Sequence, residues 1–489
     1  MNALLLYPSF PDTFWSLKQA LKFIHKRSAM PPLGLLTMAA MLPENWNLRL
    51  IDTNLEVLSE DDLAWADVAL ISAMGVQKQS ALKLIARCKA ANVTVIAGGP
   101  MFTAEHSEFP QVDHLVLNEA EVTLRLFLAD LQQGRAKRIY RSNEFADLHE
   151  TPVPMWRLLE MKHYGFMGVQ YSRGCPFNCE FCDVTALFGR KPRTKSPAQI
   201  IAELNALERA GWRGPIFFVD DNLAGNKKSL RSELLPALIA WRRSHRAMTF
   251  NTQASINIAD DAELLQLLSR AGFDTVFVGI ETPNAGGLVE CGKVQNQSRD
   301  LIRDVKKIQR AGIQVQGGFI VGFDSDSTSI FQRQIDFIQK SGIVTAMVGI
   351  LQALPGTQLY ERLRRENRLI DSGNGDNVDG TTNILPRMNR QMLLDGYRSV
   401  LKSIYSPRHY YQRVRIFLRE CGRPHVSTRL DLERMLAFFR SVLHIGVLGR
   451  ERFQYWYLLA WTLVRRPRLF SQAVTLAISG YHFRRVANF

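Results

Sequence analysis

The hydrophobic pattern of residues 1–145 predicts an alternation of strands and helices. Short apolar runs, each followed by small or polar residues, recur along this segment and are separated by helical stretches. Such runs are typical of parallel strands in a doubly wound sheet, whose ligands bind beyond the carboxyl ends of the strands. The predicted strands are residues 3–7, 48–51, 68–72, 93–97 and 114–117.

A second series of predicted strands begins after a connector. Residues 146–165 contain Pro152 and Pro154, which interrupt any regular period. Six strand–helix units then predict a (β/α)6 partial barrel over residues 166–372, with its chemistry at the carboxyl ends of the strands. A polar, glycine-rich linker follows at 373–383, and residues 384–489 have only helical periodicity. The predicted strands of this series are residues 168–172, 215–219, 249–253, 275–280, 315–321 and 345–352.

Length, composition and charge narrow the class of protein. A chain of 489 residues with 46% hydrophobic content is expected to form two or three globular domains. It has no apolar window long enough to span a bilayer, and Met1 leads directly into a strand, which predicts a cytoplasmic protein. Residues 384–489 hold 19 Lys and Arg against 5 Asp and Glu, so most of the net charge of +15 lies there. We expect any anionic partner to meet this tail.

Three of the six cysteines, Cys175, Cys179 and Cys182, form a C-x3-C-x2-C run directly after the first predicted barrel strand. Thiolates on one short loop select an iron–sulfur cluster or zinc. A closed zinc site needs a fourth ligand, and the nearest candidate, His163, lies twelve residues before Cys175. The pattern therefore favours an open [4Fe-4S] cluster. The remaining cysteines are isolated and are expected to be packed thiols: Cys88, Cys291 and Cys421.

This loop on a six-unit partial barrel resembles the radical S-adenosylmethionine (SAM) superfamily, whose pattern carries an aromatic residue before the last cysteine, here Phe181. The resemblance implies that the open iron chelates SAM and that one-electron reduction splits SAM into methionine and a 5′-deoxyadenosyl radical. It also implies that Glu281 accepts the methionine amino group and that residues 318–322 form the adenine and ribose wall. The implied SAM-binding residues are Phe181, Asp220, Gln253, Ser255, Gly279, Glu281, Gly318, Ile320, Gly322 and Leu354.

Asp220 and Asp221 have two interpretations. They either touch the ribose of SAM or cap the helix that follows them.

The amino-terminal unit, placed before such a barrel, resembles the cobalamin-binding domain of the B12-dependent radical SAM enzymes, and the resemblance extends to about residue 370. Residues 31–36, Pro-Pro-Leu-Gly-Leu-Leu, are similar to the usual first helix of these enzymes. The D-x-H-x-x-G pattern that gives cobalt a histidine is absent, since residues 8–12 read Pro-Ser-Phe-Pro-Asp. The resemblance thus implies cobalamin bound without a protein histidine; a domain that binds nothing is the alternative. The implied cobalamin-binding residues are Ser9, Ser72, Met74, Gly75, Gly98, Gly99, Pro100 and Glu119.

The basic tail has three interpretations. Residues 434–448 place apolar side chains on one helical face, with Arg434, Arg440 and His444 elsewhere. Such a segment can be a helical cap over the barrel, an amphipathic surface on anionic lipid at the inner face of a membrane, or an RNA-binding patch. The tail is similar to the carboxyl-terminal extension of the branch that includes hopanoid and bacteriochlorophyll C-methyltransferases. The apolar residues are Met435, Phe438, Phe439, Val442 and Leu443.

The function implied by these resemblances is a cobalamin-dependent radical SAM methyltransferase. It would methylate an unactivated carbon of a large hydrophobic lipid, terpenoid or tetrapyrrole, with a flavodoxin- or ferredoxin-type reductant as partner and without nucleic acid. The sequence identifies no catalytic residue beyond the cluster cysteines. The alternatives are a ring-forming or oxidative enzyme of the same architecture, an RNA-modifying enzyme, and a cobalamin sensor, which would have no use for the three cysteines.

Overall fold

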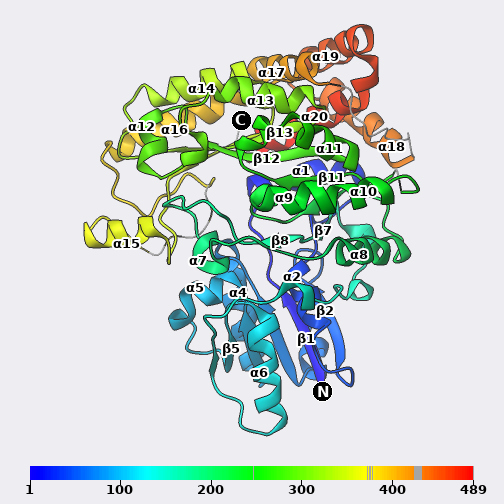
Figure 1. Ribbon diagram of the computed structural model, residues 1–489, viewed down its shortest axis with the longest axis vertical. Coiled ribbons are helices and arrows are strands. Elements are labelled where there is room, and N and C mark those ends of the chain that lie inside the picture. The colour runs from blue at the N-terminus through cyan, green and yellow to red at the C-terminus, as the bar shows by residue number, and fades with distance from the viewer. Residues whose placement is uncertain (246, 372, 374–375, 377, 423–431, 488–489) are drawn as a thin grey trace.

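The computed structural model describes residues 1–245, 247–371, 373, 376, 378–422 and 432–487, which form three units stacked along the long axis of the molecule (Figure 1). A sheet formed by the amino-terminal residues, in blue and cyan, lies at one end. A second sheet, mostly in green, lies in the middle, and the carboxyl-terminal helices cover the opposite end.

The amino-terminal sheet has six parallel strands in the order β2-β1-β3-β4-β5-β6. Its central strands read as continuous apolar runs because helices cover both of their faces. The strands are β1 (Asn2–Tyr7), β2 (Asn47–Asp52), β3 (Val68–Ser72), β4 (Thr94–Gly98), β5 (His114–Val116) and β6 (Ile139–Tyr140). The helices are α2 (Leu33–Ala39), α3 (Glu60–Trp65), α4 (Lys78–Ala90), α5 (Pro100–Glu105) and α6 (Ala120–Gln132).

The second sheet also has six parallel strands, in the order β14-β13-β12-β11-β10-β7. Within the described residues β7 and β14 are its two edges, so the barrel stays open, as the sequence predicted. The strands are β7 (Met167–Val169), β10 (Ile216–Phe218), β11 (Phe250–Gln253), β12 (Phe273–Glu281), β13 (Gln314–Val321) and β14 (Ala346–Ile350). The helices are α7 (Val184–Phe188), α8 (Pro197–Arg209), α9 (Lys227–Ser229), α10 (Leu235–Trp241), α11 (Ala262–Ala271), α12 (Ala285–Glu290), α13 (Leu301–Arg310), α14 (Ile330–Ser341) and α15 (Gln358–Arg365).

Two details of the strand prediction were wrong. The sixth strand of the first sheet, β6, was missed because two residues are too short to show a period. The predicted strand 168–172 is divided in two, because only its first part pairs with β10. Its second part forms β8 (Ser172–Arg173), which pairs antiparallel with β9 (Arg193–Thr194). This ribbon closes the base of the loop that carries the cysteines.

The carboxyl-terminal unit is helical, as predicted, and it packs over the barrel. Arg413 is fully buried there and donates to the carbonyl oxygens of Val344 and Ile404, which joins this unit to the second sheet. No helix in the described part of the chain is long and apolar enough to cross a membrane. The helices are α16 (Arg390–Ile404), α17 (Pro407–Glu420), α18 (Leu432–Ser441), α19 (Arg452–Arg465) and α20 (Phe470–Val486), with a π-helical turn at Val442–Val447.

The segment between β1 and α2 leaves the first sheet and reaches the other two units. It contains the short helix α1 (Lys18–Leu21). The ring of Phe14 stacks on Phe483 of α20, with centroids 4.3 Å apart. The ring of Trp15 contacts Phe277 of β12 edge to face, and its Nε1 lies 3.0 Å from the sulfur of Met347 in β14. This segment therefore forms one wall of the open barrel.

Candidate active site

The cysteine loop, residues 174–192, projects from the β8–β9 ribbon. Gly174 has a φ of +92°, and a Cβ there would lie 3.0 Å from three carbonyl oxygens of the same loop, so only glycine fits. The Cys175 amide donates to the Gly189 carbonyl at 3.2 Å, which folds the loop back on itself. The backbone thus presents all three cysteines on one compact loop.

Two segments that follow in the sequence, one after β12 and one after β14, form hydrogen bonds with this loop. The Glu180 amide donates to the Cys291 carbonyl, and the Leu359 amide donates to the Glu180 carbonyl, both at 2.9 Å. The Glu180 carboxylate also accepts from Nε and Nη2 of Arg362 at 2.5 and 3.0 Å. Since these segments follow β12 and β14, the second sheet fixes the position of the loop.

The three cysteines are free thiols, and two of them have an amide side chain beside the sulfur. Cys179 is buried, whereas Cys175 and Cys182 are partly exposed. Asn222 Nδ2 lies 3.8 Å from the Cys175 sulfur, and Gln295 Nε2 lies 3.6 Å from the Cys179 sulfur. Hydrogen bonds to the sulfurs are one of the means by which proteins tune iron–sulfur clusters.

The three thiols on one loop fit a cluster, in which each thiolate binds a different iron. Burial raises the pKa of the free Cys175 thiol and raises the pKa of Cys182 to about 12, so a bound cation is needed to keep these sulfurs as thiolates. Among the described residues, no three Cys, His, Asp or Glu side chains are gathered closely enough to hold one metal ion. A cubane takes each thiolate on a different iron and does not need that convergence.

Glu281, at the end of β12, forms a buried ion pair with Lys293. Lys293 Nζ donates to Oε1 at 2.6 Å, and the two side chains are only 12% and 9% exposed. Burial alone would lower the pKa of Lys293, but the charges of Glu281 and the nearby thiolates raise it. A Cβ on Gly279 would overlap the Glu281 carboxylate, so the glycine makes room for this pair. The Glu281 carboxylate thus accepts an ammonium donor of the chain itself, and its role toward SAM stays a prediction.

The structure corrects the prediction for Asp220. Its carboxylate is fully buried and accepts hydrogen bonds from the amides of Tyr171, at 3.2 Å, and Ser172, and from the Ser172 hydroxyl at 2.5 Å. It therefore neither faces a ribose nor caps the following helix. It satisfies backbone donors at the break between β7 and β8, just before the cysteine loop.

We expect Asp220→Asn to lower the free energy of unfolding by about 1–3 kcal/mol although the two side chains have the same shape. An amide has one acceptor oxygen where the carboxylate has two, and its NH2 would face a backbone donor. Urea unfolding of the anaerobic protein measures the loss. Asp221→Asn is the control: burial, with the charges of Asp220 and Asp183, raises the pKa of Asp221 to about 7, so this substitution should not destabilise at neutral pH. Equal losses in both variants would contradict the assignment.

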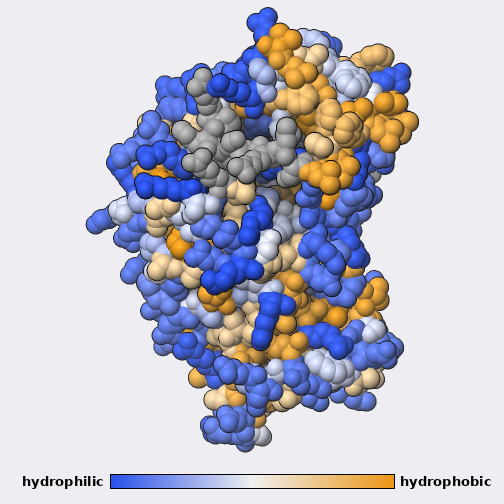
Figure 2. All heavy atoms as spheres, turned by 90° about the vertical axis from the view of Figure 1, so that its right-hand side faces the viewer, coloured by the Kyte–Doolittle hydropathy of each residue, from blue (hydrophilic) through white to orange (hydrophobic). Residues whose placement is uncertain are grey.

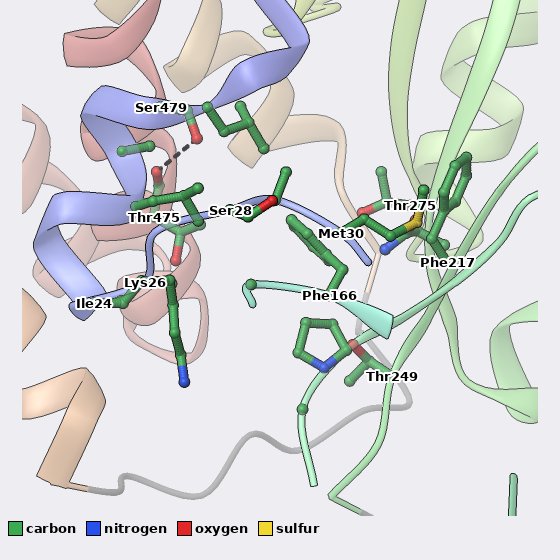
Figure 3. Close-up of a pocket in the computed structure, with 18 of the residues that line it drawn as sticks. Ile24, Lys26, Ser28, Met30, Phe166, Phe217, Thr249, Thr275, Thr475 and Ser479 are labelled. Atoms are coloured by element: carbon green, nitrogen blue, oxygen red, sulfur yellow. Dashed lines mark hydrogen bonds between the residues drawn. The ribbon is translucent and has the colours of Figure 1, made fainter. Parts of the chain in front are cut away.

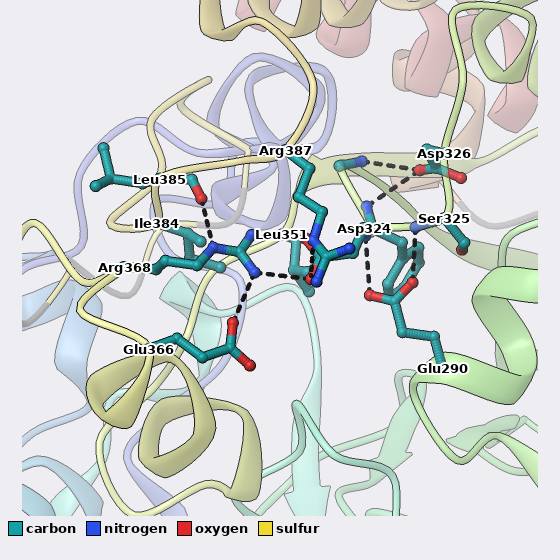
Figure 4. Close-up of polar contacts among 12 residues, drawn as sticks. Glu290, Asp324, Ser325, Asp326, Leu351, Glu366, Arg368, Ile384, Leu385 and Arg387 are labelled. Atoms are coloured by element: carbon teal, nitrogen blue, oxygen red, sulfur yellow. Dashed lines mark hydrogen bonds and ion pairs between the residues drawn. The ribbon is translucent and has the colours of Figure 1, made fainter.

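A network of ion pairs closes the carboxyl end of β13 (Figure 4). Asp324 accepts from Nη1 and Nη2 of Arg368 at 2.8 and 2.6 Å and lies 3.4 Å from Nε of Arg387. Asp326 accepts from the amide of Gly322 at 3.0 Å, and Gly322 itself has a φ of +103°. The loop beside the implied adenine and ribose wall is thus held from several sides.

The other residues implied for SAM lie in or just after strands β11, β13 and β14, except Phe181, which lies on the cysteine loop. Gly318 packs against Phe277, since a Cβ there would lie 2.8 Å from the ring. Phe181 and Ile320 pack against one buried cluster that includes Cys291. The second sheet gathers these residues at one edge, and their contacts with SAM remain predictions. The others are Gln253 at the end of β11, Ser255 after it, and Leu354 after β14.

The residues implied for cobalamin lie at the carboxyl edge of the first sheet, where local contacts already explain some of them. Gly99 has a φ of +90°, and a Cβ there would overlap the Ser72 hydroxyl. The Ser9 amide donates to the hydroxyl of Ser80 at 2.9 Å. Met74, in contrast, is 44% exposed. The others are Gly75 after β3, Gly98 at the end of β4 and Pro100 at the start of α5. Their contacts with cobalamin remain predictions.

The structure also corrects the role of Glu119, whose buried carboxylate is occupied by two arginines. It accepts from Nη1 of Arg173 at 2.8 Å and from Nη1 of Arg193 at 3.0 Å. Glu121 accepts from Nη2 of the same Arg173 at 2.8 Å. Buried charges need partners, and these arginines flank the cysteine loop. Glu119 and Glu121 therefore join the first unit to that loop.

A cavity of about 2020 Å³ runs through the open barrel. At one end it is lined by Tyr7 and Met74 of the first unit, and it reaches Gln253 at the carboxyl end of β11. It continues to Thr249, directly before β11, and so spans the length of that strand. Figure 3 shows side chains from residues 24–30, from the second sheet and from α20 around the same space.

The lining of this cavity changes along its length. Its middle is aromatic or thioether in character, whereas the end beneath α20 carries hydroxyl and amide groups. Gln472 of α20 lies 3.5 Å from Gln314 of β13, and its Oε1 is buried without a partner. The apolar lining includes Trp15, Met30, Phe166, Phe217, Phe277 and Met347, and the polar lining includes Thr249, Thr275, Gln314, Gln472, Thr475 and Ser479.

Three family models match consecutive parts of the chain: a B12 binding domain at residues 24–128, the radical SAM superfamily at 169–350 and a domain of unknown function (DUF4070) at 357–489. The chain is 40% identical over 492 residues to an uncharacterized methyltransferase of Synechocystis, covering 99% of this chain and 91% of that one. It is 33% identical over 477 residues to the hopanoid C-2 methylase of Rhodopseudomonas palustris, covering 94% and 89%. The chain belongs to the cobalamin-dependent radical SAM methyltransferases.

This radical SAM methyltransferase has the fold of a solved relative. The cobalamin-dependent radical SAM enzyme OxsB, with aqua-cobalamin bound, superposes with a TM-score of 0.64 at 14% identity, covering 100% of this chain and 79% of that chain. The enzyme uses a [4Fe-4S] cluster, SAM and cobalamin, so the cofactors predicted from the sequence are confirmed. That Cys175, Cys179 and Cys182 bind the cluster is our proposal.

Sequence reasoning missed three polar residues of the methyltransferase site. Asn222 and Gln295 lie beside cluster cysteines, and Lys293 pairs with Glu281. Asn222 had a signal, since it directly follows Asp220-Asp221 after a predicted strand. Lys293 and Gln295 had none, because they follow a helix and reach the site only through the fold.

Proposed function

We propose that this enzyme methylates an unactivated carbon of a large, mostly hydrocarbon molecule. The observation that carries the proposal is the cavity of about 2020 Å³ with an apolar middle. Small-molecule pockets are usually about 300–1,000 Å³, so this space suits a polycyclic or long-chain substrate. The similarity to a hopanoid C-2 methylase supports a lipid of that kind.

The polar end of the cavity refines the substrate class. Gln314, Gln472 and Thr475 offer hydrogen-bonding groups at the end beneath α20. A buried unpaired amide oxygen such as Gln472 Oε1 costs free energy unless a ligand or water bonds to it. We infer an amphiphile, whose polar group lies at this end and whose hydrocarbon lies along the barrel.

The bound cofactors supply the radical that removes a hydrogen atom and the methyl group that replaces it. The chain itself holds the substrate in place and excludes water, because an unshielded primary radical would react with the nearest C–H bond. Tyr7 and Met74 of the first unit and Gln253 of the barrel line one space, so a substrate carbon there faces both units. A one-electron donor of flavodoxin or ferredoxin type is required to reduce the cluster.

Isotope labelling tests the reaction. Cells that carry the enzyme are fed methionine with a trideuterated methyl group, and their lipid and pigment extracts are compared by mass spectrometry with extracts of cells that carry Cys179→Ala. We expect a lipid or pigment with one added labelled methyl group only in the first culture. A product that loses hydrogen or gains oxygen without label would favour a ring-forming or oxidative enzyme. Label in modified RNA nucleosides would favour an RNA-modifying enzyme.

We also propose that the enzyme works in the cytoplasm, at the inner face of a membrane. Its substrate class resides in membranes, and its basic tail suits an anionic surface.

A further inference from the structure

The helices α18 and α19 expose two apolar stripes that nothing in the described chain covers. On α18 and the π-helical turn, exposed apolar side chains recur at three- and four-residue spacing, and α19 repeats the pattern. Figure 2 shows such side chains gathered at the top of the molecule, where these helices lie. The first stripe is Leu432, Met435, Leu436, Phe439, Leu443 and Val447, and the second is Phe453, Trp456, Tyr457, Leu463 and Val464. We call the two stripes together the α18–α19 face.

The charges around the α18–α19 face have one sign. Arg450, Arg452, Arg465 and Arg468 are exposed near its ends. Residues 432–487 contain only two acidic side chains, Glu433 and Glu451. Glu451 is 8% exposed and pairs with Arg484, and Glu433 lies 3.5 Å from Lys26. The face is therefore apolar in the middle and positive at its margin.

This distribution favours an anionic bilayer over a second copy of the chain. Two copies joined through the same face would bring their arginines together, which costs free energy. An anionic lipid surface instead attracts arginine and accepts apolar side chains below the headgroups. The amphipathic rings of Trp456 and Tyr457 are 46% and 57% exposed on this face, and such rings are enriched at membrane–water interfaces.

The α18–α19 face is continuous with the cavity. Met435 and Phe439 are 44% and 62% exposed, and both also line the cavity. Arg468, in the turn directly before α20, lines it too. A molecule that leaves the hydrophobic layer of a bilayer beside α18 would thus meet side chains that belong both to this face and to the cavity lining.

We propose that the α18–α19 face docks on an anionic bilayer and that the substrate passes from the bilayer into the barrel beside α18. This inference rests on the proposed function, because it requires a membrane-resident substrate. It adds the docking face and the route, which enters from the side of α18 and α20 and not from the first unit.

Vesicle flotation of the full-length, cofactor-loaded protein tests the docking. The probes are vesicles of phosphatidylcholine alone and of phosphatidylcholine mixed with phosphatidylglycerol. We expect binding to the mixed vesicles that weakens with added salt. The double variant F453S/V464S should bind them at least about tenfold more weakly, since two apolar side chains no longer enter the bilayer. The matched control V57S/V289S changes two apolar residues that are 84% and 66% exposed elsewhere, and it should bind as the wild type does.

Three outcomes would overturn the docking proposal: no binding to either vesicle, equal loss in both double variants, or a dimer in light scattering that F453S/V464S abolishes. Unchanged iron and cobalamin content shows that the variant is folded. The labelling experiment then separates the two proposals. Labelled product without vesicle binding refutes only the docking, whereas vesicle binding without labelled product refutes the proposed function.

Discussion

Replacing Cys179 by alanine is expected to abolish the radical chemistry. A [4Fe-4S] cluster bound by only three protein thiolates is not retained when one of these ligands is removed. The iron content should therefore fall from about four atoms per chain to below about one. Cys179 is buried in the loop whose conformation depends on Gly174 and the β8–β9 ribbon. Among the described residues, that loop has no fourth cysteine that could replace it as a ligand. Iron and sulfide analysis after anaerobic reconstitution, with chromatography of 5′-deoxyadenosine, measures both losses.

Cys421→Ala is the control for Cys179→Ala. Cys421 is also a buried thiol, and burial raises its pKa to about 11, but it lies in the helical unit at the end of α17. This variant should keep its cluster and form deoxyadenosine at the wild-type rate. A chain that loses its cluster with Cys421→Ala and keeps it with Cys179→Ala would refute the assignment of the cluster.

The second large effect is expected from Arg173→Met. Arg173 is 12% exposed and pairs with Glu119 and Glu121, which are 2% and 5% exposed. Removing it leaves the buried Glu121 without its arginine and Glu119 with Arg193 alone, and breaking a buried ion pair typically costs about 3–5 kcal/mol. Urea unfolding at neutral pH measures this cost. The exposed pair Arg125–Glu150, at 2.8 Å with side chains 59% and 56% exposed, gives the control, since Arg125→Met should cost less than about 1 kcal/mol.

The cost of Arg173→Met should shrink as the pH falls. Burial alone would raise the pKa of Glu121, but the hydrogen bonds and charge of Arg173 lower it. A lowered carboxyl pKa contributes stability that is complete above the ordinary pKa of glutamate and is lost as the pH falls through the lowered value. The variant lacks this contribution, so the two unfolding curves should approach each other in acid. A difference that grows on acidification would contradict this explanation.

The order of the units and the parallel sheets could be predicted from the sequence because buried parallel strands have a strong local signal. Residues 3–7 and 68–72 are apolar runs that helices must cover, and both are strands. The β8–β9 ribbon could not be predicted in this way. Its four residues include Arg173 and Arg193, whose position depends on carboxylates of the first unit.

The candidate site, like the fold, could be predicted only in part from the sequence. Glu281 and the cysteines could be predicted as site residues because their chemistry and their place after a strand or in a spaced motif are local facts. Asp220 also follows a predicted strand. Only the structure shows that its carboxylate is fully buried and accepts hydrogen bonds from backbone amides. Lys293 lies twelve residues after Glu281, and the fold of the intervening segment brings the two charges together.

The sequence by itself determined the family and the cofactors and predicted the three thiolate ligands, since each depends on residues that are close together along the chain. Only the tertiary structure decided where a substrate can lie and which face can meet a membrane. The α18–α19 face has a local periodic signal, but only the structure shows which of its side chains stay exposed. The cavity is built from side chains that are hundreds of residues apart, such as Trp15, Phe277 and Phe439. Contacts over that separation leave no periodic signal, because they depend on how the three units pack.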